Sequence, residues 1–267
     1  MMPALNADHL LSLRDVCIHL GKHTFGPFTL SIQTGERIAI LGPSGAGKST
    51  LLKLLARELT PASGQAVFCQ RSLKEWSLVD LSQRRAILPQ SHEVAFGLPV
   101  DLVIGLGRVA RAYDPELKKI VRQSAELTCA AHLLERRFDT LSGGEKARVQ
   151  MARVFAQLWD IEKGLLLVDE PLAALDPGLQ ISLMDAIYAF ASQRGHAILA
   201  ILHDINQALQ GFDRLILIKQ GMIAGDYPHN QITIPLLESL YDVRLVSAVT
   251  DTGETIVAPD LKQKIPA

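Results

Sequence analysis

Short apolar runs, most of them ending in a turn, alternate with helical stretches along most of this chain. The runs have the length and composition of β-strands and cover residues 10–19, 27–32, 36–41, 65–69, 85–90, 164–169, 197–202 and 214–218. Helices are predicted over residues 51–56, 143–158, 177–193 and 204–210. Strands that alternate with helices indicate an α/β fold with a largely parallel sheet, whose ligands bind at the carboxyl ends of the strands.

One helical region interrupts this alternation. Between residues 99 and about 137, apolar positions recur at three- and four-residue spacing without an intervening strand. We therefore predict a helical insertion at about 91–141, between two halves of the α/β core. The tail, about 222–267, is short and mixed, and it shows no clear pattern.

Composition and charge are those of a globular protein. The chain has 27 Lys and Arg against 28 Asp and Glu, so no excess positive charge attracts nucleic acid or an anionic membrane surface. No apolar run approaches the length of about 18 residues that a membrane span requires, and the first residues lack the pattern of an export signal. Cys17, Cys69 and Cys129 match no metal-binding spacing and are expected to be buried thiols.

The strongest chemical signal lies between the strand that ends at Leu41 and the helix at 51–56. The residues there read Gly42-Pro43-Ser44-Gly45-Ala46-Gly47-Lys48-Ser49-Thr50. Strand, Gly-x4-Gly-Lys-Ser, then helix is the pattern of a phosphate-binding loop. Glycines let backbone N–H groups turn toward a phosphate, and the helix N-terminus adds partial positive charge. Lys48 can reach the β- and γ-phosphates, and the Ser49 hydroxyl can ligate Mg²⁺. The alternative, a glycine turn that merely contains lysine, does not explain the flanking elements.

Two carboxylates follow the apolar strand 165–168. In a parallel sheet, Asp169 and Glu170 would lie at the same edge as the phosphate loop. Asp169 is suited to hold Mg²⁺, directly or through water, and Glu170 is suited to polarise an attacking water. A loop that simply begins with acidic residues is the alternative.

A second motif, Leu141-Ser142-Gly143-Gly144-Glu145, opens the helix at 143–158. Ser142 as N-cap and Glu145 three residues later predict a capping box. On spacing alone, a well-capped helix and a phosphate site fit equally well. The two glycines let a large anion approach a bare helix N-terminus, which favours a second phosphate site.

In their order along the chain, these motifs resemble those of the ATP-binding cassette family, the ATPase subunits of ABC transporters. The resemblance covers about residues 10–230. It matches Gln90 to the Q-loop glutamine, which would contact Mg²⁺ or water, and Asp176 to the D-loop acid at the dimer seam. It also matches His203, which follows an apolar strand, to the switch histidine that contacts the γ-phosphate. The resemblance implies one cassette domain over 1–267, with a P-loop NTPase core, an N-terminal antiparallel β region and a helical subdomain.

The resemblance also implies ATP and Mg²⁺ as cofactors and a head-to-tail homodimer. Each ATP would lie between the phosphate loop of one chain and the signature residues 142–145 of the other. Water would attack the γ-phosphate, with charge stabilised by Lys48, His203 and Ser142 of the partner subunit. Hydrolysis would then release the two halves. The family's adenine-stacking aromatic is missing, because residues 18–21 read Ile-His-Leu-Gly.

Local features resemble the importer ATPases for iron chelates, haem and cobalamin. The segments 203–206 and 88–90 match patterns of that group, and 152–159 and 91–96 resemble its haem-importing members. The resemblance implies a haem importer ATPase on the cytoplasmic face of the inner membrane. It would bind a polytopic permease and act indirectly with a periplasmic substrate-binding protein.

Other classes are possible from the sequence. A ferric-siderophore or cobalamin importer ATPase is the alternative within the group. A soluble cassette ATPase fits less well, because such chains carry two cassettes or a long coiled-coil insertion. A nucleotide-binding module without turnover would not need Glu170 and His203. Arg84, Arg85 and Glu93 are candidates for lining the groove that receives a permease helix.

Overall fold

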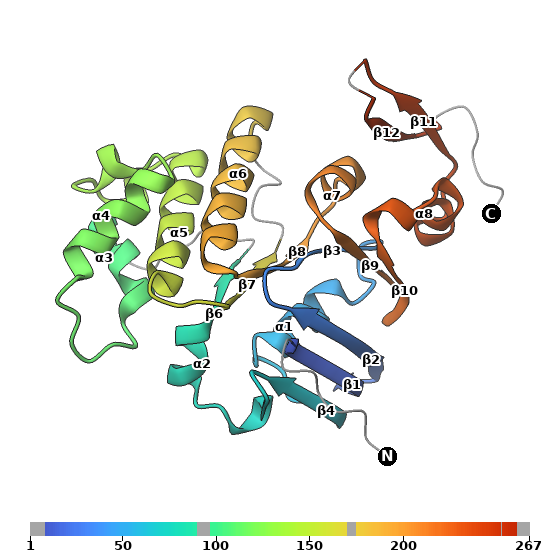
Figure 1. Cartoon of the computed structure of the whole chain (residues 1–267), viewed down its shortest axis with the longest axis horizontal. Coiled ribbons are helices and arrows are strands. Elements are labelled where there is room, and N and C mark those ends of the chain that lie inside the picture. Colours follow the sequence, from blue (N-terminus) through green and yellow to red (C-terminus); the bar gives the residue numbers. More distant parts are fainter. Residues whose placement is uncertain (1–8, 90–96, 170–174, 252, 261–267) are drawn as a thin grey trace.

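The described residues form two β-sheets, a small hairpin and surrounding helices (Figure 1). The computed structural model describes residues 9–89, 97–169, 175–251 and 253–260. Within these ranges, no helix has both the length and the apolar content to cross a membrane.

The central sheet has six strands in the order β10-β9-β3-β8-β7-β6. All neighbouring pairs are parallel except β10 with β9. The strands are β3 (Arg37–Leu41), β6 (Arg85–Leu88), β7 (Leu165–Asp169), β8 (Ala197–Ile201), β9 (Arg214–Lys219) and β10 (Met222–Pro228). The α/β fold with a largely parallel sheet is therefore confirmed.

A second, antiparallel sheet has the order β2-β1-β4-β5. Its strands are β1 (His9–Leu20), β2 (His23–Gln33), β4 (Ser63–Phe68) and β5 (Arg71–Ser72). A separate two-stranded hairpin, formed by β11 (Leu245–Val249) and β12 (Thr255–Pro259), lies near the carboxyl end of the described chain.

The helices cover both faces of the central sheet. They are α1 (Lys48–Leu55), α2 (Leu78–Arg84), α3 (Val100–Gly105), α4 (Leu117–Leu127), α5 (Gly143–Leu158), α6 (Pro177–Arg194), α7 (Ile205–Gly211) and α8 (Ile234–Tyr241). Short 3₁₀ turns span Leu73–Glu75, Leu106–Arg108, Ala131–Leu133, Phe138–Thr140 and His229–Gln231.

Strand β7 shows why the core has two layers. Successive side chains of a strand point to opposite faces, so Leu166 and Val168 pack with α5 and α6, whereas Leu165 and Leu167 pack with α1 and the antiparallel sheet. All four side chains are fully buried. Burial on both faces explains why the sequence of this strand is continuously apolar rather than alternating.

The helical insertion has a core of its own. Side chains of α3 and α4 pack together with one face of α5, which includes Val149 and Ala152. Another face of α5, which includes Met151 and Phe155, packs against the central sheet. Helix α5 thus joins the insertion to the sheet.

Two expectations from the sequence are wrong. Cys17 and Cys69 are only half-buried and Cys129 is exposed. Cys129 lies beyond the end of α4, in a turn with a positive φ of 53°, rather than on the buried face of that helix. Arg85 does not line an outer groove: it is buried, and its guanidinium donates to the carbonyl of Leu55 at 2.9 Å. Burial lowers the pKa of Arg85 to about 10.

Candidate nucleotide-binding site

The phosphate loop links β3 to α1 and leaves the start of the helix open. Gly47 is the N-cap, with a left-handed φ of 103°, and no side chain caps the helix. The first turn also carries no acidic residue. Uncapped N–H groups and the positive end of the helix dipole therefore suit a bound phosphate.

The back of the loop is held by neighbouring strands. A Cβ on Gly47 would lie 2.8 Å from Cδ1 of Phe25, and a Cβ on Gly42 would lie 2.1 Å from the carbonyl oxygen of Ile218. Gly221, in the turn between β9 and β10, donates its N–H to the carbonyl of Ala46 at 2.9 Å. Glycine is required at positions 42 and 47 by these close approaches, and the contacts hold the loop against β2, β9 and the turn that follows β9.

Lys48 lies across this loop. Its side chain is buried, at 5% exposure, and its ammonium group donates to the carbonyls of Gly42 at 2.8 Å and Pro43 at 3.0 Å. A phosphate oxygen would be a stronger partner for the ammonium group than these carbonyls, because it carries a negative charge.

Lys48→Ala should weaken ATP binding by about 2–3 kcal/mol, because a charge-assisted contact is lost in a partly dry site. Equilibrium titration with ATP measures this change. Lys53→Ala is the matched control, since Lys53 is an exposed lysine of the same helix. Unchanged affinity in Lys48→Ala would contradict the assignment of the phosphate loop.

Strand order places other predicted residues at the same sheet edge. Strand β8 lies between β3 and β7, with Ile201 opposite both Ile40 and Asp169. Asp169 ends β7, and the exposed His203 lies two residues after β8. The phosphate loop, Asp169 and His203 therefore lie on adjacent strand ends, although they are far apart in sequence. Gln90 and Glu170 lie outside the described residues.

The signature motif has the predicted capping box. The Ser142 side chain accepts from the N–H of Glu145 at 3.3 Å, and the Glu145 carboxylate accepts from the N–H of Ser142 at 2.8 Å. Hydrogen bonds from Ser142 lower the pKa of this carboxyl. A Cβ on Gly143 would meet nothing within 4 Å, whereas one on Gly144 would lie 2.7 Å from Leu179. The capped helix end is thus open on its Gly143 side.

The signature and the phosphate loop belong to different parts of the chain's fold (Figure 1). Helix α5 is attached to the edge strand β6, where the side-chain amide of Gln157 donates to the carbonyl of Arg85 at 3.1 Å. Strands β7 and β8 separate β6 from β3, which carries the phosphate loop. Asp176 has a local role that the sequence analysis missed: it caps α6 by accepting from the N–H of Leu179 at 3.0 Å.

Tyr241 is another residue that the sequence analysis missed. Its hydroxyl is buried beside the backbone of Gly42, without a hydrogen bond of good geometry to any described residue. Burial raises the pKa of Tyr241 to about 12. Helix α8, part of the tail that showed no pattern, therefore reaches the start of the phosphate loop.

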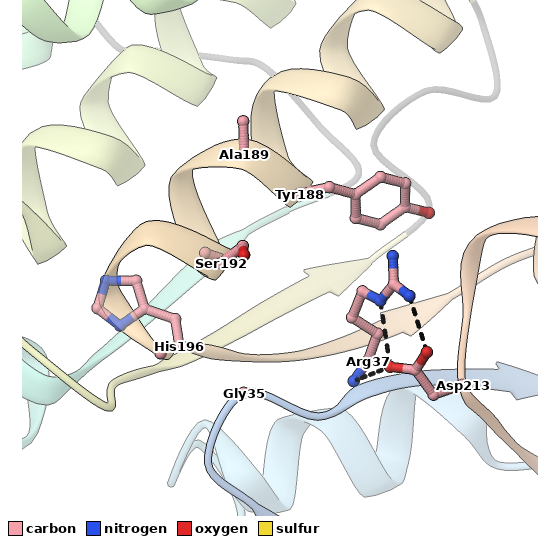
Figure 2. A pocket seen from close by; sticks show the side chains of 9 residues that line it. Gly35, Arg37, Tyr188, Ala189, Ser192, His196 and Asp213 are labelled. Carbon is pink, nitrogen blue, oxygen red and sulfur yellow. Dashed lines mark hydrogen bonds and ion pairs between the residues drawn. The ribbon is translucent and has the colours of Figure 1, made fainter.

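A separate cavity of about 600 Å³ lies at the opposite edge of the sheet. Figure 2 shows Arg37 and Asp213 pointing toward each other, with an Nη2–Oδ1 distance of 2.7 Å. The Arg37 guanidinium also lies 5.3 Å from the ring centre of Tyr188. His196 lines this cavity too, but its Nδ1 accepts from the N–H of Gly164 at 2.8 Å, and burial lowers its pKa to about 4. Arg37 and Asp213 form an ion pair with each other, which is a structural role.

Comparison with known proteins agrees with this geometry. A family model described as ABC transporter matches residues 25–173. The Hemin import ATP-binding protein HmuV of Pseudomonas aeruginosa is 44% identical over 203 residues, which cover 75% of this chain and 79% of the relative. The chain belongs to the ABC transporter family, of which it is an ATP-binding, ATP-hydrolysing cassette.

Two solved structures establish the fold. An inward-facing ABC transporter, assigned to the metal-chelate type, has a TM-score of 0.81 at 22% identity, covering 96% of this chain and 98% of that chain. A dimeric ATP-binding cassette in a post-hydrolysis state, bound to ADP and phosphate, has a TM-score of 0.73 at 22% identity. This match covers 83% of this chain and 100% of that chain. The resemblance to ABC cassettes and the predicted fold class are confirmed.

Proposed function

We propose that this chain is the ATPase subunit of a bacterial importer that carries haem across the inner membrane. The observation that carries the proposal is the 44% identity to a hemin import ATP-binding protein, over three-quarters of both chains. The ferric-siderophore or cobalamin importer remains the alternative, because the cargo does not contact this subunit in the proposed mechanism.

The proposed site is built on the loop 42–50 and the neighbouring strand ends. Ser49, Asp169 and Gln90 would hold Mg²⁺, which neutralises phosphate charge when it is bound. The open N–H groups of α1 and the Lys48 ammonium group would hold the β- and γ-phosphates. The carboxylate of Glu170 would orient and polarise the attacking water.

The second half of each site would come from another copy of the chain. Gly143 leaves the start of α5 open, and β7 and β8 separate this helix from the phosphate loop of its own chain. A head-to-tail homodimer would bring residues 142–145 of one chain to the γ-phosphate held by the other. Asp176 would lie at the seam, and His203 would contact the γ-phosphate.

The proposed assembly places the subunit at the cytoplasmic face of the inner membrane. It would bind a polytopic permease and act indirectly with a periplasmic substrate-binding protein. The whole chain, 1–267, would form one cassette domain, with a helical subdomain at about 91–141 and a tail at about 222–267.

Deletion of the gene should abolish growth on haem as sole iron source, because the permease alone cannot use ATP. Growth should return with the wild-type chain but not with Glu170→Gln expressed to the same level. The chain should also co-purify with a polytopic membrane protein. Normal growth on haem, together with failure on a siderophore or on cobalamin, would reject haem and favour the alternative.

A further inference from the structure

One side chain connects the helix after His203 to strand β12. Asn206, in the first turn of α7, donates from Nδ2 to the carbonyl of Val257 at 3.1 Å. Its Oδ1 accepts from the N–H of the same residue at 2.7 Å. The two residues are 51 positions apart. The asparagine amide thus pairs with the backbone of β12 as a neighbouring strand would.

Helix α7 has little stability of its own, because its seven residues form only about two turns. Asp204 caps it by accepting from the N–H of Asn206 at 2.8 Å, and Ala208 is fully buried beneath it. Ile205 and Leu209 also pack against the core, so the hydrogen bonds to Val257 add a directional polar contact to the apolar packing that holds the helix in place.

The hairpin likewise depends on its neighbours, since two strands alone are marginally stable. Leu245 and Val257 bury their side chains in the core beside α7 and α8. The N–H of Leu245 donates to the carboxylate of Glu238, in α8, at 2.9 Å. The hairpin is thus fixed to the core of the protein. Its hydrogen bonds to Asn206 can therefore hold α7 in place.

We infer that Asn206 is a positioning residue for ATP hydrolysis, which sets the location of His203 by clamping α7 to the hairpin of residues 245–259. Leu202, on the strand side of His203, is buried and donates its N–H to the carbonyl of Ile40 at 3.2 Å. The chain before His203 is therefore held by the sheet, and the chain after it is held by α7. The inference rests on the role proposed for His203.

Asn206→Ala in the full-length chain should lower kcat for ATP about five- to tenfold, because both hydrogen bonds of the clamp are lost. The KM for ATP should change less than twofold, because the loop that binds the phosphates is carried by β3 and α1. Asn206→Asp should likewise lower kcat and leave the KM for ATP nearly unchanged. Its carboxylate places an oxygen, which cannot donate, where the Nδ2 donor of asparagine faces the Val257 carbonyl.

A matched control separates positioning from stability. Ile32→Val removes one buried methylene group in β2, in the core on the opposite face of the central sheet from α7, and should cost similar stability while kcat stays normal. Hydrogen exchange supplies a readout besides activity. The amides of residues 205–211 and of Val257 should exchange faster in Asn206→Ala, with the rest of the described chain unchanged.

The variant His203→Ala distinguishes failure of this inference from failure of the proposed function. If His203→Ala is inactive and Asn206→Ala has normal kcat, the inferred positioning role of Asn206 is overturned and the proposed function stands. If the kcat of Asn206→Ala is normal once it is corrected for the folded fraction, as is expected for Ile32→Val, the inferred role of Asn206 is also overturned. If His203→Ala hydrolyses ATP normally, the proposed role of His203 fails, and the inference fails with it.

Discussion

Glu170→Gln should slow ATP hydrolysis by about 10²–10³-fold, because an amide cannot polarise the attacking water as a carboxylate does. ATP binding should persist, since the phosphate loop and Lys48 are unchanged. The bound γ-phosphate would then hold two chains together, so the variant should form a dimer that is stable in ATP and Mg²⁺. Phosphate release and molecular size in ATP measure both effects.

Glu162→Gln is the matched control for this variant. It makes the same charge change at an exposed position just before β7, at the opposite end of the strand that precedes Glu170. Hydrolysis by Glu162→Gln should be normal. Near-normal hydrolysis by Glu170→Gln would remove this residue from the catalytic role, whatever its effect on assembly.

Mixing two inactive variants should restore activity if each site is shared between two chains. Lys48→Ala disables the phosphate loop, and Ser142→Arg blocks the signature. Each variant alone has two defective sites and should be inactive. In a mixed dimer both defects fall in one site, and the other is intact. An equal mixture should reach about a quarter of the wild-type rate, since half the dimers are mixed and each has one working site.

The double variant, with Lys48→Ala and Ser142→Arg in one chain, is the control for mixing. Paired with a wild-type chain, it places one defect in each site, so the mixed dimers should have no activity. An equal mixture with wild type should therefore also retain about a quarter of the rate, all of it from wild-type dimers. If the two single variants show no activity when mixed, the shared site is not supported.

Local motifs were the part of the site that the sequence could predict. The phosphate loop is one continuous segment, and its glycines and uncapped helix follow from the order of residues 42–50. The capping box of Ser142 and Glu145 is likewise local, because the two residues are one helical turn apart. Strands such as β7 were recognisable because burial on both faces demands an unbroken apolar run.

The sequence by itself therefore determined most strands and helices of the α/β core, the phosphate loop and the resemblance to the family, since each can be recognised in short local segments. It did not determine β10, α8 or the hairpin of the tail. Only the tertiary structure decided that β8 lies between β3 and β7, which puts the phosphate loop, Asp169 and His203 at one edge. Only the structure paired Asn206 with Val257, because the backbone of a strand presents the same groups whatever its sequence. The burial of Arg85, the exposure of Cys129 and the approach of α8 to the phosphate loop were decided in the same way. They depend on how elements that are distant in sequence pack together, and the local sequence pattern does not predict that packing.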